Sequence, residues 1–219
     1  RGVKENTTIL FGAMNTAGGS LKWFRDALYG GETPQNDAYP RINKEIEAGA
    51  KNPTGLIFLP YMAGERAPIW DPNARGTFMG LNMNTTRAEM LRAVMEGTSF
   101  ALQDNLDQAI KTGIPIRDFI CCGGCSKSDI WLKIKASVIG QEIKIPSVNL
   151  GAPGGLGYMN AAFMGEYKTP EDASRAALQI KKIVEPVEEW IPIYKELYQI
   201  YLDSYQSLKS QFAALAQIK

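Results

Sequence analysis

The sequence predicts an α/β fold in which helices pack on a mixed sheet. Patterns typical of strands and helices alternate from the start of the chain. The apolar run at 55–61 is typical of a strand that is covered on both faces. A second apolar run, at 119–122, leads directly into Gly123 and Gly124 at a corner between a strand and a helix. No internal repeat or low-complexity linker interrupts the 219 residues, so we expect one domain.

The elements before the long central helix follow from periodicity and turn residues. We expect a strand over 7–14, a helix over 20–28, a turn over 30–34 and a helix over 42–50, all preceding the 55–61 strand. The helix over 20–28 places its apolar side chains on one face: Leu21, Phe24 and Leu28.

A capping box at Thr86 and Glu89 predicts the longest central helix, which extends toward Gly113. Arg92 and Glu96, four residues apart, are expected to pair on its outer face and to contribute roughly a few tenths of a kcal/mol. The following positions recur at helical spacing and are expected in the core: Leu91, Val94, Met95, Thr98, Leu102, Leu106 and Ile110.

The second half of the chain continues the alternation. After the glycine corner we expect a strand over 142–145 and a helix through Met164. A short helix over 170–178 follows, and a long amphipathic helix after Pro192 closes the chain.

The loop at 62–76 is rich in glycine and proline yet carries several charged and aromatic residues. Loops of this length in a compact domain are often functional. We interpret this one as a packed surface loop, in which Glu65 pairs with Arg66 and Arg75 and Asp71 begins an Asp-Pro-Asn turn.

Composition excludes several classes of function. The 24 basic and 23 acidic residues give a net charge of +1, which does not support a basic nucleic-acid-binding face. No apolar run reaches the ~20 residues that a bilayer span requires. The sequence contains no histidine, so neither a Ser-His-Asp triad nor a histidine metal site is possible. We expect a cytoplasmic protein with no nucleic-acid or membrane partner.

The three cysteines, Cys121, Cys122 and Cys125, lie within five positions and cannot build a disulfide framework. Cys122 and Cys125 have C-x-x-C spacing, but the second pair of ligands that a zinc site requires is missing. We therefore interpret the cysteines as small buried strand residues rather than as a redox or metal motif.

The glycine corner is the strongest candidate for a binding site. A glycine pair leaves no Cβ between the backbone and a ligand, so a purine or a phosphate can lie against the chain. The S-x-x-D spacing of Ser126 and Asp129 predicts that a helix opens at Ser126 and directs unpaired N–H groups at the corner. The same pattern occurs in α/β proteins that bind nothing, so the residues alone leave both interpretations open.

Three separated motifs together resemble a known family. They are Gly76-Thr-Phe-Met-Gly-Leu81, then after seven residues Glu89-Met-Leu-Arg-Ala-Val-Met-Glu96, and the corner 123–131. Together and in this order they resemble the second, C-terminal lobe of the FGGY carbohydrate kinases. The Gly-Glu-Arg-Ala-Pro loop at 64–68 and the tyrosine-rich tail resemble the xylulokinase and gluconokinase branches. The resemblance implies a ribonuclease H-like lobe of the actin type, with a mixed sheet flanked by helices.

The resemblance also implies a site for ATP with Mg²⁺. Gly124 and Ser128 match family positions that line the adenine and ribose pocket, with Gly123 beside them. Gly18 and Lys22 match positions of a helix start that face the nucleotide. No residue of this chain is expected to bind a metal ion.

Two departures from the family pattern limit what this chain is expected to do. Tyr158 and Met159 stand where the family usually has small residues. The family's catalytic aspartate, in a Gly-Asp-Asn segment, and its phosphate-binding turn would precede Thr7 and are not in this sequence. The chain begins at Arg1 rather than Met, and we expect it to be the C-terminal lobe of a longer protein without its first strands.

The expected function is that of the ATP-binding lobe of a sugar kinase. The intact protein would phosphorylate a xylulose-like or gluconate-like sugar that is bound through the absent first lobe, and this chain alone would be inactive. An unpaired sheet edge would favour a homodimer. The alternatives are a nucleotide-binding module without catalysis and a dimerising lobe related to the actin-type ATPases.

Overall fold

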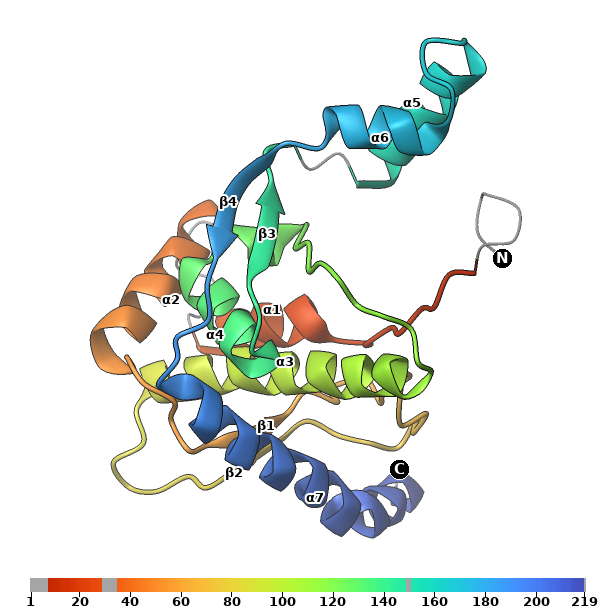
Figure 1. Ribbon diagram of the computed structural model, residues 1–219. Coiled ribbons are helices and arrows are strands. Elements are labelled where there is room, and N and C mark those ends of the chain that lie inside the picture. The colour runs from red at the N-terminus through yellow and green to blue at the C-terminus, as the bar shows by residue number, and fades with distance from the viewer. Residues whose placement is uncertain (1–7, 29–34, 149–150, 219) are drawn as a thin grey trace. The chain divides into compact units, whose positions relative to one another are not determined.

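The computed structural model describes residues 8–28, 35–148 and 151–218 (Figure 1). The chain divides into two compact units, a division that the sequence pattern did not indicate. Unit 1 comprises Arg1–Ile116 and Glu188–Lys219, and unit 2 comprises Arg117–Val187. The chain therefore leaves unit 1, builds unit 2 and returns to unit 1 for its last helix.

Unit 1 is built around one long helix. Its elements are α1 (Ala17–Leu28), α2 (Gln35–Gly49), β1 (Ile57–Leu59), β2 (Thr77–Met79), α3 (Arg87–Lys111) and α7 (Trp190–Gln217). Helix α3 contacts α1, α2, β1 and α7, and Figure 1 shows α7 running along the same side of α3 as the two short strands. Strands β1 and β2 pair antiparallel, with Phe58 opposite Phe78. All three residues of β1 are buried, as the apolar run predicted.

Helix α3 begins as predicted and approaches β1 closely. The Thr86 hydroxyl accepts a hydrogen bond from the Glu89 N–H, and the Glu89 carboxylate accepts one from the Thr86 N–H, so the capping box is complete. A Cβ on Gly97 would collide with the carbonyl oxygen of Phe58, so only glycine permits this spacing of α3 and β1. The first half of the expected apolar stripe is buried, whereas Leu102 and Ile110 are exposed.

The pairing of Arg92 with Glu96 is confirmed, but their expected exposure is wrong. Both side chains are fully buried, and Nε of Arg92 lies 2.8 Å from Oε1 of Glu96. The guanidinium also donates to the carbonyl oxygens of Ala50 and Lys51 and to the Tyr194 hydroxyl. Residues of α2's end and of α7, far away in the sequence, therefore cover the face of α3 that periodicity assigned to solvent.

Unit 2 consists of short strands and two groups of helices. Its elements are η1 (Gly124–Lys127), α4 (Asp129–Ile139), β3 (Ile143–Pro146), α5 (Gly151–Phe163), α6 (Pro170–Ala177) and β4 (Ile180–Val184). Strand β3 pairs antiparallel with β4, and Lys144 of β3 forms a parallel bridge with Ile120, so the pairing is mixed. One apolar cluster joins α4 to this ladder: Leu132, Ala136, Ile143, Ile145 and Val184.

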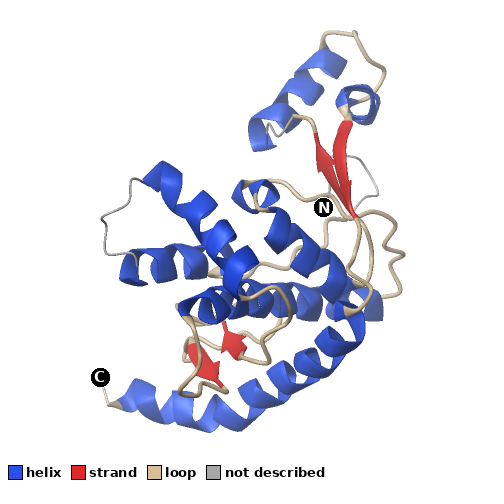
Figure 2. Cartoon of the chain, turned by 90° about the vertical axis from the view of Figure 1, so that its left-hand side faces the viewer, coloured by secondary structure: helices blue, strands red, loops and turns tan. Residues whose placement is uncertain are grey.

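Helices dominate the described chain, and the strands form two separate two-stranded sheets (Figure 2). The expected strand over 7–14 is wrong for residues 8–14, which form no strand. Ile9, Leu10 and Phe11 are exposed there, and the backbone hydrogen bond from the Ala67 N–H to the Ala13 carbonyl (3.2 Å) does not build a strand ladder. The expected strand over 119–122 is reduced to one bridge at Ile120. The predicted turn over 30–34 and Thr7 lie outside the described residues.

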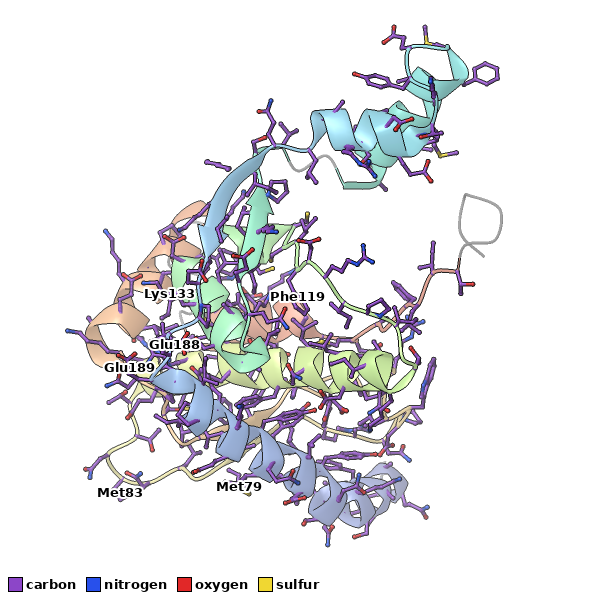
Figure 3. All side chains as sticks on the ribbon, viewed as in Figure 1. Met79, Met83, Phe119, Lys133, Glu188 and Glu189 are labelled. Carbon is purple, nitrogen blue, oxygen red and sulfur yellow. The ribbon has the colours of Figure 1, made fainter. Side chains whose placement is uncertain are left out.

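In unit 1, strand β2 contacts helix α7 through Met79. Figure 3 shows Met79 at the end of β2 beside α7 and Met83 in the loop that follows. The Ser204 hydroxyl of α7 lies 3.8 Å from the sulfur of Met79, whereas Met83 is completely exposed. Glu188 and Glu189 immediately precede α7, which begins at Trp190. No helix in the described part of the chain is long and apolar enough to cross a membrane.

Candidate nucleotide site

The glycine corner in unit 2 has a backbone conformation that only glycine adopts readily. Backbone hydrogen bonds from Cys121 N–H to the Lys144 carbonyl (3.0 Å) and from Lys144 N–H to the Phe119 carbonyl (2.8 Å) fix the approach to the corner. Gly123 then has φ 84° and ψ −163°, a region essentially restricted to glycine. The Ser126 hydroxyl donates to the Gly123 carbonyl (2.7 Å) and closes the 3₁₀ turn η1.

Gly123 and Gly124 leave an open surface. Both residues are exposed, and no heavy atom of the described residues lies within 4 Å of the position that a Cβ would occupy on either one. Gly124 has no positive φ, so its lack of a side chain is not required by the local backbone. The corner therefore has the bare backbone that the sequence predicted for contact with a flat ligand.

The helix after the corner begins later than predicted. Helix α4 begins at Asp129, and its N-cap is Ser128, whose hydroxyl accepts from the Trp131 N–H (3.3 Å). The predicted opening at Ser126 is wrong, because Ser126 belongs to η1. The Asp129 carboxylate does not close a capping box and instead lies 2.8 Å from Nζ of Lys182 on β4. Ser128 is buried, so the structure gives it a capping role at the base of the corner.

The other predicted nucleotide residues lie in unit 1, at the start of α1. Gly18 and Lys22 are both exposed and lie one helical turn apart. A Cβ on Gly18 would meet nothing within 4 Å among the described residues. The buried Ser20 between them donates to the Thr16 carbonyl (2.5 Å), and the Thr16 hydroxyl donates to the Pro60 carbonyl after β1 (2.5 Å). The start of α1 is thus fixed to the end of β1.

The loop at 62–76 holds the same helix start. The Glu65 carboxylate accepts from the Asn15 N–H (2.8 Å) and from the Arg66 N–H (2.8 Å), and the Asn15 amide donates to the carbonyls of Ala63 and Gly64 (each 3.2 Å). Glu65 is buried, and burial raises the pKa of its carboxyl. The interpretation as a packed loop is confirmed. Among the described residues, the hydrogen bonds of Glu65 come from backbone N–H groups, and Arg66 contributes through its positive charge, which opposes the rise in the pKa of the Glu65 carboxyl.

Asp71 connects this loop to α7. One carboxylate oxygen accepts from the Asn73 N–H (2.8 Å), which confirms the predicted Asp-Pro-Asn turn. The other accepts from the Tyr205 hydroxyl (3.0 Å), and burial together with this bond raises the pKa of Tyr205 to about 12. Sequence reasoning missed this contact and the role of Asn15, because both partners are distant in the sequence. Arg75 donates to the carbonyls of Pro72 and Ala74.

Unit 1 also contains a cavity of about 440 Å³ that includes neither Gly18 nor Lys22. Its lining is mainly polar and comes from the end of β1, the loop, α3 and α7: Tyr61, Pro68, Ile69, Asp104, Asp107, Gln108, Lys111, Tyr198, Leu202, Asp203, Tyr205, Gln206 and Lys209. The Tyr198 hydroxyl donates to the Asp107 carboxylate (2.7 Å) within it. Sequence reasoning did not indicate this cavity, because its residues come from four separate segments.

The expectation that the cysteines are small buried residues is wrong. Cys122 is exposed, and Cys121 and Cys125 are half-buried. The sulfur atoms of Cys121 and Cys125 lie 3.4 Å apart, so the close pair is not the C-x-x-C pair of the sequence motif. Within the described residues, no group of three or more Cys, Asp or Glu side chains could hold a metal ion.

Solved structures identify the class of protein to which this fold belongs. The ligand-bound xylulose kinase from Lactobacillus acidophilus matches with a TM-score of 0.82 and 28% identity, over 93% of this chain and 40% of that one. The gluconate kinase from the same organism matches with a TM-score of 0.81 and 28% identity, over the same shares. The fold is that of the C-terminal part of sugar kinases, an actin-type ATPase fold in which helices dominate.

Sequence comparison gives the family. The xylulose kinase of Staphylococcus epidermidis is 29% identical over 213 residues, which are 97% of this chain and 42% of that protein. The model of the C-terminal domain of the FGGY family of carbohydrate kinases matches residues 2–166. The chain therefore belongs to the FGGY family of carbohydrate kinases. It spans about two-fifths of the length of the curated relatives that it matches.

Proposed function

We propose that this chain is the ATP-binding lobe of a carbohydrate kinase, which transfers the γ-phosphate of ATP to a hydroxyl of a small sugar. Family membership and relatives named xylulose kinase and gluconokinase support a xylulose-like or gluconate-like substrate. The observation that carries the assignment of the lobe is the open glycine corner, where the described residues other than the chain neighbours leave the Cβ positions of Gly123 and Gly124 free to 4 Å. A flat adenine can lie there against bare backbone.

Each predicted residue would have a distinct task. Gly123 and Gly124 would receive the purine face, while Ser128 fixes the first turn of α4 beneath them. Gly18 would allow a nucleotide to approach the start of α1, where the N–H groups of a first helical turn favour an anion. The exposed Lys22 ammonium would add a positive charge on the same face of that helix. These are binding and positioning roles, and none of them requires a proton acceptor.

The chemistry requires groups that this chain does not supply. Phosphoryl transfer depends on positioning and charge stabilisation, with a base to accept the proton of the sugar hydroxyl. We assign that base and most of the sugar contacts to a first lobe outside this chain. The Mg²⁺ would enter as part of the Mg-ATP substrate, because the described residues offer no cluster of metal ligands. This chain alone is therefore expected to be inactive.

One observation favours a second candidate, a dimerising module with no catalysis. Helix α5 and the residues after it expose several large apolar side chains in unit 2: Leu156, Met159, Phe163 and Met164. Exposed apolar residues of this kind mark many interaction surfaces. A protein that self-associates through this helix and binds no adenine nucleotide would match the second candidate and not the first.

The deciding experiment compares two alanine variants of the intact protein. Gly124→Ala adds a methyl group to the proposed purine surface, and Gly157→Ala adds one to the exposed face of α5. Neither Cβ meets an atom within 4 Å among the described residues, and neither glycine has a positive φ, so both variants should fold. We expect ATP binding, measured by calorimetry, to weaken at least about tenfold in Gly124→Ala only, which corresponds to about 1.4 kcal/mol.

The same proteins should be assayed for sugar-dependent release of ADP across pentuloses, hexonates and polyols. Activity with a pentulose or a hexonate supports the proposed substrate class. ATP binding without turnover on any sugar would instead support a regulatory nucleotide-binding module without catalysis. Equal ATP affinity in the Gly124→Ala and Gly157→Ala variants would refute the corner as the adenine site.

A further inference from the structure

The half-buried cysteine pair at the glycine corner is not used by the proposed kinase function. Sγ of Cys121 and Sγ of Cys125 lie 3.4 Å apart, in hydrogen-bonding contact. Cys121 packs against the apolar cluster between α4 and the β3–β4 ladder, which fixes its position. Cys125 lies in η1, directly after the two exposed glycines. The fold thus holds two thiols side by side across the corner.

The surroundings of the pair favour one sulfur as the nucleophile. The hydrogen bond from the Cys121 thiol and the nearby Lys135 ammonium lower the pKa of Cys125 to about 5, although burial opposes this. The same hydrogen bond, together with burial, raises the pKa of Cys121. Lys135 is held over the ring of Trp131, with Nζ 4.8 Å from the ring centroid. The lowered pKa of Cys125 favours its thiolate form, and the raised pKa of Cys121 favours its thiol form.

We propose that Cys121 and Cys125 form a reversible intramolecular disulfide, a thiol-oxidation site that reacts with small-molecule disulfides such as glutathione disulfide. The Cys125 thiolate attacks one sulfur of the oxidant, so a mixed disulfide forms at Cys125 and one glutathione thiolate leaves. Cys121 then loses its proton to solvent and attacks the Cys125 sulfur. This closes the Cys121–Cys125 bond and releases the second glutathione thiolate. Two protein thiols are oxidised, and one small disulfide is reduced to two thiols.

The reaction requires little movement, and that movement affects the corner. A disulfide has an S–S distance of about 2.05 Å, so the sulfurs must approach by roughly 1.3 Å from their separation of 3.4 Å. Gly123 and Gly124 lie between the two cysteines in the chain, inside the loop that the new bond would close. Oxidation should therefore alter the backbone of the corner, which is also the proposed adenine surface.

Cys122 provides the matched control. It is exposed and adjacent in sequence, and it has the C-x-x-C spacing with Cys125 that usually suggests redox pairing. The fold nevertheless places Cys121, and not Cys122, against Cys125. If the folded structure determines the pairing, the disulfide joins Cys121 and Cys125. If sequence spacing determines it, the disulfide joins Cys122 and Cys125.

The test uses the reduced 219-residue chain in a glutathione buffer with about 0.1 mM reduced glutathione, followed by alkylation of free thiols and peptide mass spectrometry. Neighbouring thiols have effective concentrations in the millimolar range, so internal disulfide should exceed mixed disulfide by about tenfold. The Cys122→Ser variant should behave as wild type. Cys125→Ser should form no internal disulfide, and Cys121→Ser should stop at the mixed disulfide on Cys125.

A denatured sample separates the effect of the fold from that of spacing. In urea we expect the preference for the Cys121–Cys125 bond to disappear, while circular dichroism of the native variants confirms that each one is folded. A native Cys122–Cys125 bond would overturn the proposal, as would mixed disulfide without internal disulfide in the wild type. Reduction by dithiothreitol should restore all three thiols, and a failure to do so would contradict reversibility.

Discussion

Replacing Arg92 with methionine should destabilise unit 1 severely, because it would leave a carboxylate buried without its cation. Arg92 and Glu96 are both fully buried in the first half of α3, with Nε of Arg92 2.8 Å from Oε1 of Glu96. The guanidinium donates to the carbonyls of Ala50 and Lys51 at 3.0 and 2.9 Å and lies 4.3 Å from the ring centroid of Trp190. It therefore holds the end of α2 and the start of α7 against α3.

The expected loss follows from what remains in the variant. Among the described residues, Glu96 keeps two neutral donors, the Tyr194 hydroxyl at 2.9 Å and the Thr54 hydroxyl at 3.1 Å. Burial already raises the pKa of this carboxyl, and the arginine is the main opposing influence. Removing one member of a buried ion pair typically costs about 3–5 kcal/mol. With a urea m-value of about 2 kcal/mol/M, the unfolding midpoint should fall by roughly 1.5–2.5 M.

Urea unfolding followed by circular dichroism measures this loss, with an exposed ion pair as the control. Arg87 forms two hydrogen bonds with Glu45, at 2.7 and 2.9 Å, and both side chains are partly exposed. The variant Arg87→Met should therefore cost at most about 1 kcal/mol. The double variant Arg92→Met/Glu96→Met should cost less than the sum of its single changes. If Arg92→Met cost no more than Arg87→Met, the reasoning would be refuted.

Three further predictions follow from other parts of the chain. Gly97→Ala should lower the free energy of unfolding by about 1–3 kcal/mol, because a methyl group there collides with β1. Gly157→Ala in α5 should raise it by up to about 1 kcal/mol. Thermal unfolding measures both changes, and changes of the same sign in the two variants would contradict the close packing of Gly97 on β1. Glu65→Ala should cost about 1–3 kcal/mol and speed hydrogen exchange at the amides it binds, and unchanged exchange at those amides would contradict its anchoring role. Alkylation of Cys125 by iodoacetamide should stay fast down to a pH of about 5 and slow below it, since only the thiolate reacts. In the Cys121→Ser variant the rate should begin to fall at a higher pH. Identical pH profiles for the two proteins would show that Cys121 does not lower the pKa of Cys125.

The elements that sequence reasoning located well are those with strong local signals. The capping box at Thr86 and Glu89 places the start of α3, and the apolar run at 55–61 contains β1. Both depend on interactions within a few residues, so they can be recognised without tertiary structure. The Asp-Pro-Asn turn at Asp71 is local in the same way.

Two of the failures have the opposite cause, since they depend on distant segments, and a third is local. Periodicity placed Arg92 and Glu96 at the surface because it cannot show that α7 covers that face of α3. The apolar residues at 8–14 suggested a strand, but strand formation depends on a pairing partner rather than on composition. The corner helix was placed at Ser126 because S-x-x-D spacing does not show that a 3₁₀ turn comes first.

The candidate site was only partly accessible to sequence reasoning. Gly18, Lys22, Gly123, Gly124 and Ser128 were selected by their resemblance to family motifs, and their role in nucleotide binding stays a prediction. The structure supplies what the motifs could not, namely the exposure of all three glycines and the burial of Ser128 as a helix cap. The close pair of Cys121 and Cys125 was missed because the C-x-x-C spacing drew attention to Cys122.

Steady-state kinetics of the intact kinase and its Gly124→Ala variant test the central proposal most directly. If adenine lies on the bare backbone of the corner, the KM for ATP should rise at least about tenfold, while the KM for the sugar and the unfolding midpoint remain unchanged. An unchanged KM for ATP in a folded, active variant would show that the nucleotide binds elsewhere.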